Sequence, residues 1–220
     1  RLSSATILYQ RDLEFFDSYF GKYRVNFIHY GVDIDFFYPL SIEAQQTKRI
    51  LFAGHYLRNT SMLYRVIIKL AKNHPEVKFD LLVPEHARNT EGLLQLLDHR
   101  AVTWHKNLSD EQLRHLYQTS YLLLLPMNNS GANTAIVESL ACGLPIVTTD
   151  VGGIRDYGGA EIFQIVANDD DDAMINLIEK YLANSDLRNQ VSINCRQFAE
   201  QKLAWPIVAQ KHLEIYSKLL

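Results

Sequence analysis

The chain has 220 residues, of which 47% are hydrophobic and 21% charged, and its formal net charge is −3. This balance is typical of a globular chain that is long enough to bury a core without disulfide or metal staples. The slightly negative charge gives no electrostatic basis for binding nucleic acid, so that class of partner is excluded.

The cysteines and the first residues of the chain are informative about the cellular compartment. Two cysteines, Cys142 and Cys195, do not make a disulfide framework. The first residues, 1–4, lack the charged and then apolar pattern of a signal peptide. The longest apolar run, 121–126, is too short to span a bilayer. These features favour a reducing, cytoplasmic location, and the absence of an initial Met indicates a piece of a longer protein.

The first fifty residues show short elements and then a linker. The pattern predicts a strand at 5–9, a helix at 10–20 ended by Gly21, and a strand at 25–28. A turn at 31–33 and a polar stretch at 41–48 follow, and the polar stretch is typical of a linker.

From residue 49 onward, apolar strands alternate with helical patterns. The predicted strands are 50–53, 77–83, 102–104, 121–125, 145–149 and 162–166. The predicted helices are 61–73, 91–99, one beginning with a capping box at Ser109 and Gln112, 134–142, and three segments within 170–220. Strands that are nearly all apolar and alternate with helices predict a doubly wound, parallel α/β sheet covered on both faces. Ligands of such folds bind beyond the carboxyl ends of the strands, so we expect chemistry in the loops there.

The loop at 126–134 is the first such candidate. It follows a predicted buried strand, opens a helix and contains Gly131, so its backbone amides could approach an anion closely. The same letters fit an ordinary loop in which Asn133 or Thr134 caps the helix. The loop alone does not decide between these interpretations.

The segment that follows, 135–153, is more specific. It has Glu138 in the second helical turn, Gly143 at the helix end, Pro145 at the start of a strand, and Gly152 and Gly153 after it. This order and spacing closely resemble the donor-binding motif of retaining, family 4-type glycosyltransferases of the GT-B fold. The resemblance implies a Rossmann-like C-terminal domain that binds a nucleotide sugar.

The resemblance extends over nearly the whole chain and implies its division into parts. Residues 1–30 resemble the end of the N-terminal acceptor domain, and 31–48 resemble the interdomain linker. Residues 49–203 would form the nucleotide-sugar-binding domain, and 204–220 the closing helix that crosses toward the N-terminal domain. The rest of the N-terminal domain would then lie in the same or another polypeptide.

Carried over residue by residue, the motif gives candidate binding residues. Glu138 matches the family glutamate that binds the donor ribose hydroxyls, since a carboxylate accepts charge-assisted hydrogen bonds from them. Ser130 stands where the family has a first glutamate that contacts the sugar, which puts the identity of the sugar in question. The intervening small residues and the start of the helix would face the phosphates; these are Gly131, Ala132, Asn133 and Thr134.

Two other loops supply the remaining candidates. The loop after the first strand, which the family uses for the diphosphate, contains Gly54, His55 and Arg58. Arg58 is its only permanent cation and could bind phosphate in a bidentate way, although a surface role fits it too. His55 occupies a position where the family often has arginine, and a structural role remains open for it. Lys106 lies where the family contacts the base, and a solvated surface charge is equally compatible.

Two acidic clusters have structural explanations. The pair Asp33 and Asp35 has a spacing used for metals in another glycosyltransferase fold, but it lies in the linker, so a turn role is favoured. The run 169–172 precedes a helix, where acidic residues complement the helix dipole, so it is interpreted as a cap. We therefore expect no metal site.

The resemblance implies transfer of a sugar from a UDP- or GDP-sugar to a glycan, lipid or protein acceptor, with retention, as in polysaccharide biosynthesis. Glu138 and Arg58 are the candidates for the reacting centre. The missing half could provide peripheral membrane association. Two alternatives remain open: a non-catalytic nucleotide-sugar-binding or assembly module, and a nucleotide-sugar epimerase of the same fold.

Overall fold

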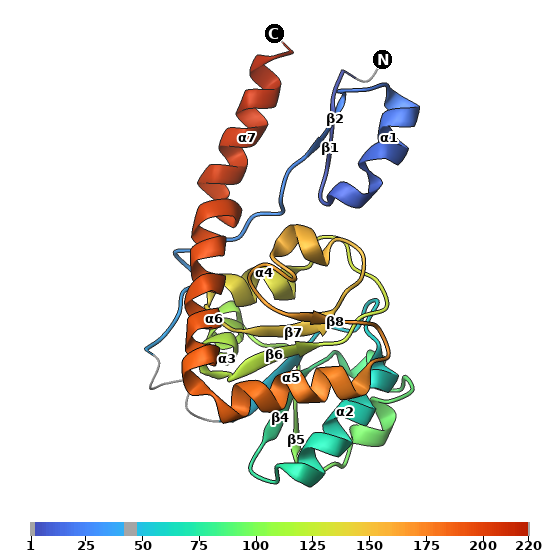
Figure 1. The fold of residues 1–220 in the computed structure, drawn as a ribbon, viewed down its shortest axis with the longest axis vertical. Helices are drawn as coiled ribbons and strands as arrows, with labels where there is room; N and C mark the ends of the chain where they lie inside the picture. The colour runs from blue at the N-terminus through green and yellow to red at the C-terminus, as the bar shows by residue number, and fades with distance from the viewer. Residues whose placement is uncertain (1–2, 42–47, 220) are drawn as a thin grey trace.

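The computed structural model describes residues 3–41 and 48–219, and its main body is a parallel sheet flanked by helices (Figure 1). The sheet has six strands in the order β5-β4-β3-β6-β7-β8. They are β3 (Arg49–Ala53), β4 (Lys78–Leu82), β5 (Val102–His105), β6 (Leu122–Leu125), β7 (Ile146–Thr149) and β8 (Ile165–Val166). All pairings are parallel, which confirms the predicted doubly wound α/β fold.

Helices cover both faces of this sheet. They are α2 (Thr60–Asn73), α3 (Asp110–Thr119), α4 (Thr134–Ala141), α5 (Asp171–Ala183) and α6 (Ser185–Phe198). Helices α2 and α5 pack together on one side, while α3 and α4 lie on the other side, where α4 packs against α6 (Figure 1). The four leucines of β6 are therefore fully buried, as the apolar strand pattern predicted.

The N-terminal residues form a separate small unit beside the C-terminal helix (Figure 1). It comprises β1 (Ala5–Ile7), a 3₁₀ turn (Gln10–Asp12), α1 (Leu13–Phe20) and β2 (Val25–Phe27), with β1 parallel to β2. Residues 42–47 of the predicted linker lie outside the described residues. The chain ends in a π-helical turn (Ala199–Leu203) and α7 (Trp205–Ser217), which runs up to the N-terminal unit.

The chain enters and leaves the main body at one point. The amide of Val32 donates to the carbonyl of Leu203 at 2.8 Å, and the amide of Trp205 donates to the carbonyl of Val32 at 3.3 Å. A Cβ on Gly31 would lie 2.4 Å from the Trp205 ring, so only glycine permits this close crossing.

A second contact joins the N-terminal unit to the main body. The Asp156 carboxylate accepts the backbone amide of Gln10 at 2.8 Å and the side-chain amide of Gln10 at 3.2 Å. The Tyr157 hydroxyl donates to the carbonyl of Leu8 at 2.8 Å and accepts the amide of Tyr30 at 2.9 Å. The small unit is thus held by the side chains of Asp156 and Tyr157, in the 3₁₀ helix (Ile154–Tyr157) that follows Gly153.

The structure confirms the local predictions that rested on a helix cap or a turn. Ser109 and Gln112 form the predicted capping box of α3. Asp33 accepts the amides of Asp35 and Phe36, which confirms its turn role. Asp170 accepts the amide of Ala173 and caps α5.

Two predicted elements were wrong in extent. The helix predicted at 91–99 is a series of turns with one short 3₁₀ helix (Leu94–Leu96). Gly92 has φ of +84°, and a Cβ there would lie 2.1 Å from the carbonyl oxygen of Thr60, so the backbone takes a left-handed turn against α2. The last strand is restricted to β8, because residues 158–163 form a turn in which Gly158 has φ of +94°.

A buried carboxylate ties three strands together. Asp80 on β4 is 2% exposed and accepts two hydrogen bonds from Arg49 on β3, both at 2.6 Å, and one from His105 on β5 at 2.7 Å. Burial alone would raise the pKa of Asp80, but the hydrogen bonds from Arg49 and His105 outweigh it and hold the pKa below its ordinary value. The pairing is therefore complete at neutral pH and is lost as the pH falls through the lowered pKa.

We expect Asp80→Ala to destabilise the fold by about 2 to 3 kcal/mol, because it removes hydrogen bonds between charged groups at a buried site. Thermal unfolding should show Tm lower by about 4 to 12 °C at pH 7, with the difference from wild type shrinking under acid conditions. Asp98→Ala, at an exposed carboxylate without a partner among the described residues, serves as the control. Equal Tm values for the two variants would contradict the role given to Asp80.

Candidate functional site

A cavity of about 310 Å³ opens at the carboxyl ends of β3, β4 and β5. Its walls come from the loops after these strands and from α3 and α4, and they include Ala53, Leu82, Pro84, Asn107, Leu113, Tyr117 and Ala135. This is the edge of the sheet at which the topology predicted chemistry. Its volume is at the lower end of the range for small-molecule sites.

The structure brings six of the candidate residues together in this cavity: Gly54, His55, Arg58, Lys106, Thr134 and Glu138. Four others, Ser130, Gly131, Ala132 and Asn133, do not line it. The cavity thus unites the loop after β3, the loop after β5 and the first turns of α4, which are far apart in sequence.

Arg58 is a partly buried cation on the wall of the cavity. Its Nε donates to the carbonyl of Ala53 at 3.1 Å, and its Nη1 donates to the carbonyl of Tyr56 at 3.1 Å and contacts Met127 Sδ at 3.3 Å. Burial lowers the pKa of Arg58 to about 10, which still leaves it charged at neutral pH. Within the described part of the chain, no carboxylate pairs with it, and Nη2 has no hydrogen bond. A partly buried, charged guanidinium that has no carboxylate partner and a free donor favours a negatively charged ligand.

Close packing explains why glycine precedes this arginine. Gly54 has φ of +87°, and a Cβ there would lie 2.8 Å from Arg58 Nη2. Gly54 therefore provides both the left-handed turn and the space around the free donor of Arg58.

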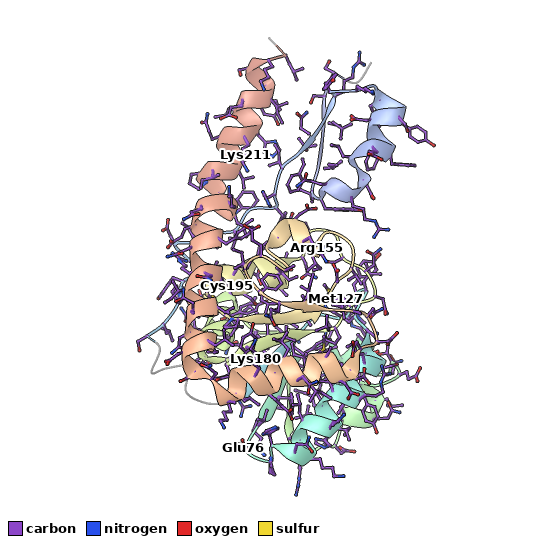
Figure 2. All side chains as sticks on the ribbon, in the orientation of Figure 1. Glu76, Met127, Arg155, Lys180, Cys195 and Lys211 are labelled. Carbon is purple, nitrogen blue, oxygen red and sulfur yellow. The ribbon has the colours of Figure 1, made fainter. Side chains whose placement is uncertain are left out.

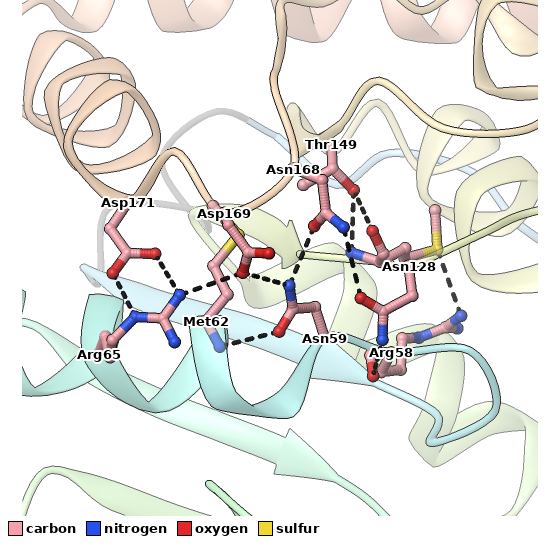
Figure 3. A network of polar contacts seen from close by, with 10 residues as sticks. Arg58, Asn59, Met62, Arg65, Asn128, Thr149, Asn168, Asp169 and Asp171 are labelled. Atoms are coloured by element: carbon pink, nitrogen blue, oxygen red, sulfur yellow. Dashed lines mark hydrogen bonds and ion pairs between the residues drawn. The ribbon is translucent and has the colours of Figure 1, made fainter.

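A polar network anchors the Arg58 loop to two neighbouring loops (Figure 3). Asn59 is 6% exposed, caps α2 by accepting the amide of Met62, and donates to Asn168 and Asp169 at 2.9 Å each. Asn128 donates to the carbonyl of Arg58 at 3.4 Å. The loops after β3, β6 and β8 are thereby connected, which fixes the backbone on which Arg58 is carried.

The same network explains the acidic run before α5. Arg65 on α2 pairs with Asp171, with Nη2 to Oδ1 at 2.9 Å, and with Asp169 at 3.2 Å (Figure 3). Lys69 pairs with Asp172 at 2.5 Å. Besides capping, these carboxylates thus join α5 to α2. Among the described residues, no group of three or more His, Cys, Asp or Glu is arranged to hold a metal ion.

Glu138 faces the cavity from the second turn of α4 and is largely buried. Burial raises the pKa of Glu138 to about 7, although the hydrogen bond donated by the Tyr117 hydroxyl acts in the opposite direction. Tyr117 is itself buried on α3, and burial together with the nearby Glu138 raises its pKa well above the ordinary value. The carboxyl group is therefore divided between its two protonation states near neutral pH and has an aromatic hydroxyl that orients it.

The raised pKa has a consequence for stability. The folded state binds the proton of the Glu138 carboxyl group more tightly than the unfolded state does. This proton binding therefore contributes stability at acid pH, and the contribution is lost as the pH rises from about 4.5 through about 7. We expect Glu138→Gln, which keeps an acceptor for Tyr117, to remove this dependence. The measurement is Tm of both proteins without ligand from pH 5 to 8; curves that stay parallel would contradict the assignment.

The loop of Ser130 has a different role from the cavity wall. Ser130 is 4% exposed, its hydroxyl donates to the carbonyl of Gly131, and its own carbonyl accepts the amide of Gly153 at 2.8 Å. A Cβ on Gly131 would lie 3.3 Å from the ring of Tyr9, in the N-terminal unit. The loop is therefore packed between Gly153 and Tyr9, and its serine side chain is used internally.

The start of α4 combines a cap with an exposed helix end. Asn133 accepts the amide of Ala135 at 3.1 Å, as its capping interpretation predicted. Thr134 and Ala135 line the cavity, so the amino end of the helix adjoins it. An amino end of this kind favours a negative ligand group.

His55 and Lys106 lie at the rim. His55 is exposed and its ring contacts that of His86 edge to face at 5.5 Å between centroids. Lys106 forms an ion pair with Glu85 and has a half-exposed side chain. A ligand could engage Lys106 only by competing with this surface pair.

Sequence reasoning missed Tyr117, Asn59 and Tyr9. Tyr117 occupies an apolar position of an amphipathic helix, so its hydroxyl gave no separate signal. Asn59 directly follows Arg58 and precedes a helix, and a cap signal was available there. Tyr9 contacts the Ser130 loop from the N-terminal unit, a long-range contact that no local pattern contains.

None of the helices among residues 3–41 and 48–219 combines the length and the apolar character needed to cross a membrane.

Solved structures share this fold. A sucrose-phosphate synthase from Thermosynechococcus elongatus superposes with a TM-score of 0.82 at 20% identity, covering 99% of this chain and 59% of that one. Anabaena Alr3699/HepE, in complex with UDP and glucose, superposes with a TM-score of 0.81 at 16% identity, covering 98% of this chain and 63% of that one. Both likenesses establish the GT-B glycosyltransferase fold of the chain.

Curated relatives are similar at the level of sequence. A D-inositol 3-phosphate glycosyltransferase of Gordonia bronchialis is 28% identical over 121 residues, which is 54% of this chain and 26% of that protein. Another, of Corynebacterium jeikeium, is 24% identical over 212 residues, covering 86% of this chain and 50% of that protein. The chain thus spans half or less of the length of these relatives. The model of the family described as "Glycosyl transferases group 1" matches residues 41–198, and the chain therefore belongs to that family.

Proposed function

We propose that this chain is the donor-binding half of a glycosyltransferase that uses a UDP- or GDP-sugar and retains the configuration of the transferred sugar. The observation that carries the proposal is the cavity in which Arg58, partly buried and without a carboxylate partner among the described residues, shares the walls with Glu138. A cation for the diphosphate and a carboxylate for the ribose hydroxyls are the two groups that such a donor requires.

The groups that line the cavity would have different roles in the reaction. The bond between the anomeric carbon and the diphosphate oxygen breaks, the electron pair stays on that oxygen, and the acceptor oxygen bonds the anomeric carbon and gives its proton to the departing diphosphate. Negative charge therefore grows on the diphosphate, where Arg58 Nη2 and the amino end of α4 would stabilise it. Glu138 would fix the ribose and so position the diphosphate. Acceptor groups would come from an N-terminal domain in the same or another chain, which could also contact a membrane.

The hydrogen bond of the Ser130 side chain bears on how the donor sugar would be held. Because its hydroxyl is bonded within its own loop, the side chain makes no charged contact there. We propose that the sugar is held by backbone groups of this loop rather than by a carboxylate.

A non-catalytic binding module is the second candidate, and the same internal bonding of Ser130 favours it. This module would bind a nucleotide sugar without transferring it. An epimerase of the same fold would instead convert a free nucleotide sugar without any acceptor.

The test is thermal unfolding and calorimetric titration of the chain with UDP, GDP, UDP-glucose and GDP-mannose. At about 100 times Kd, binding should stabilise the fold by about 2.7 kcal/mol and raise Tm by about 5 to 11 °C. Absence of any shift at millimolar nucleotide overturns the proposal. Turnover of the sugar into an acceptor by the chain joined to an acceptor domain separates the enzyme from the binding module, and a new epimer without acceptor identifies the epimerase.

A further inference from the structure

A second cavity, of about 520 Å³, lies at the opposite edge of the sheet. It is formed where α2 ends and where β4 and β5 begin, with an apolar floor that includes Ile68, Ala71 and Ala101. Figure 2 shows Glu76, which is adjacent to this edge in sequence, at the end of the molecule away from Arg155 and Met127. The cavity lined by Arg58 and Glu138, here called the donor cavity, is at the carboxyl ends of the same two strands, roughly 13 to 17 Å away by strand length.

Four nitrogen-bearing side chains line this cavity: Lys72, Lys78, His99 and Arg100. Lys72 and Arg100 are exposed, and within the described residues neither has a hydrogen bond or an ion pair. Lys78 Nζ donates only to the carbonyl of Pro75, at 3.1 Å. These ammonium and guanidinium groups therefore have donors left for a ligand.

His99 adds a directed donor. Its Nδ1 accepts the amide of Ala101 at 3.3 Å, so the proton of the neutral ring is on Nε2. The imidazole can then donate to a ligand without becoming charged, beside the permanent charge of Arg100.

No carboxylate lines the cavity among the described residues, although the chain as a whole is negative. Two carboxylates are equally near to Lys78 in sequence: Glu76, which is engaged by Lys48 at 3.2 Å, and Asp80, which is engaged by Arg49 and His105. Asp98 precedes His99 but is not part of the lining. The local charge is thus opposite in sign to that of the whole chain and is not neutralised within the cavity.

We propose that this cavity binds the phosphate group of a small organic phosphate ester, separately from the donor cavity. Two ammonium groups, one guanidinium and one imidazole N–H match the several oxygens and the double negative charge of a phosphate monoester. The apolar floor, with Ile68 and Ala101, covers the carbon part of the same ligand. A nucleotide at the donor cavity is not required for this binding.

The test uses inorganic phosphate and phenyl phosphate as probes, titrated into the ¹⁵N-labelled chain at low salt with saturating UDP present and again without it. We expect saturable shifts of the Arg100 and Ala101 amides in both series, with phenyl phosphate binding more tightly than phosphate. Because these amides report only on the second cavity, a failure of UDP to bind would leave this result readable. Vesicles with and without phosphatidylglycerol form another arm: binding to them assigns the phosphate to a lipid, and binding of free probes alone assigns it to a soluble ester.

The variant Lys72→Gln/Arg100→Gln removes two of the unpaired cations and should weaken phenyl phosphate binding at least about tenfold. Lys211→Gln/Lys218→Gln removes the same charge from the C-terminal helix and should change it less than about twofold. Lys72 also lies near the carbonyl end of α2, so Tm of each variant is measured to separate folding from binding. No saturable shift, displacement of the probe by UDP, or equal affinity of the two double variants would overturn the proposal.

Discussion

Glu138→Ala is expected to weaken the binding of a nucleoside diphosphate by about 10- to 100-fold. The change removes a carboxylate that can accept hydrogen bonds from two ribose hydroxyls, and hydrogen bonds to charged groups contribute about 1.5 to 3 kcal/mol. Calorimetric titration at pH 8, where the group with a pKa of about 7 is mostly ionised, gives the largest difference from wild type.

The matched variant Glu138→Gln separates charge from packing, since it preserves an acceptor for Tyr117. We expect an intermediate affinity that no longer increases between pH 6 and 8, whereas wild-type affinity increases over that range beyond the titration of the nucleotide itself. Glu161→Gln, at an exposed glutamate, should bind as the wild type does. If Glu138→Ala binds the nucleotide unchanged, the ribose role of Glu138 is wrong.

Gly152→Ala is expected to destabilise the fold by about 2 to 5 kcal/mol and to displace the Ser130 loop. Gly152 has φ of +56°, and a Cβ there would lie 1.9 Å from the carbonyl oxygen of Ser130 and 2.7 Å from Asn129 Oδ1. A left-handed conformation costs alanine about 1 to 2 kcal/mol, and overpacking adds about 1 to 3 kcal/mol. Denaturant unfolding measures the loss, and nucleotide titration reports whether the displaced loop affects the cavity.

Gly21→Ala provides the comparison for this variant. Gly21 also has a positive φ, +92°, but its nearest neighbours to an added Cβ are side-chain atoms of Arg24 at 3.9 Å. Its ψ of 144° lies outside the left-handed helical region, so Gly21→Ala should show the cost of its own backbone conformation without overpacking. Equal losses for the two variants would mean that the contact between Gly152 and the Ser130 carbonyl does not constrain the loop.

The fold could be predicted from the sequence because the strands are mostly apolar and alternate with segments of helical periodicity. The helix at 91–99 failed since Leu93 and Leu96 have helical spacing, whereas the conformation of Gly92 is imposed by the Thr60 carbonyl of another element. Local periodicity contains no term for such a contact.

The site was accessible only in part, for a related reason. Glu138, Arg58 and Thr134 follow strand ends or open helices, so topology alone directs them toward one edge. The bonding of Arg58 to two carbonyls and the packing of Tyr9 against Gly131 and Gly153 depend on how distant loops pack. These long-range contacts decide which hydrogen-bond donors remain free for a ligand, and no local sequence pattern contains them.

The crossing at Gly31, Val32 and Trp205 has a mechanical consequence. One covalent connection, the segment from β2 to Val32, links the N-terminal unit to the main body, and its hydrogen bonds with Leu203 and Trp205 fix it to the start of α7. The bonds between Gln10 and Asp156 form a second attachment of the same unit to the main body. Moving the N-terminal unit away from the main body would break the bonds between Gln10 and Asp156. Asp156 lies three residues after Gly153, whose amide donates to the Ser130 carbonyl, so a displacement of the unit would be felt by the Ser130 loop.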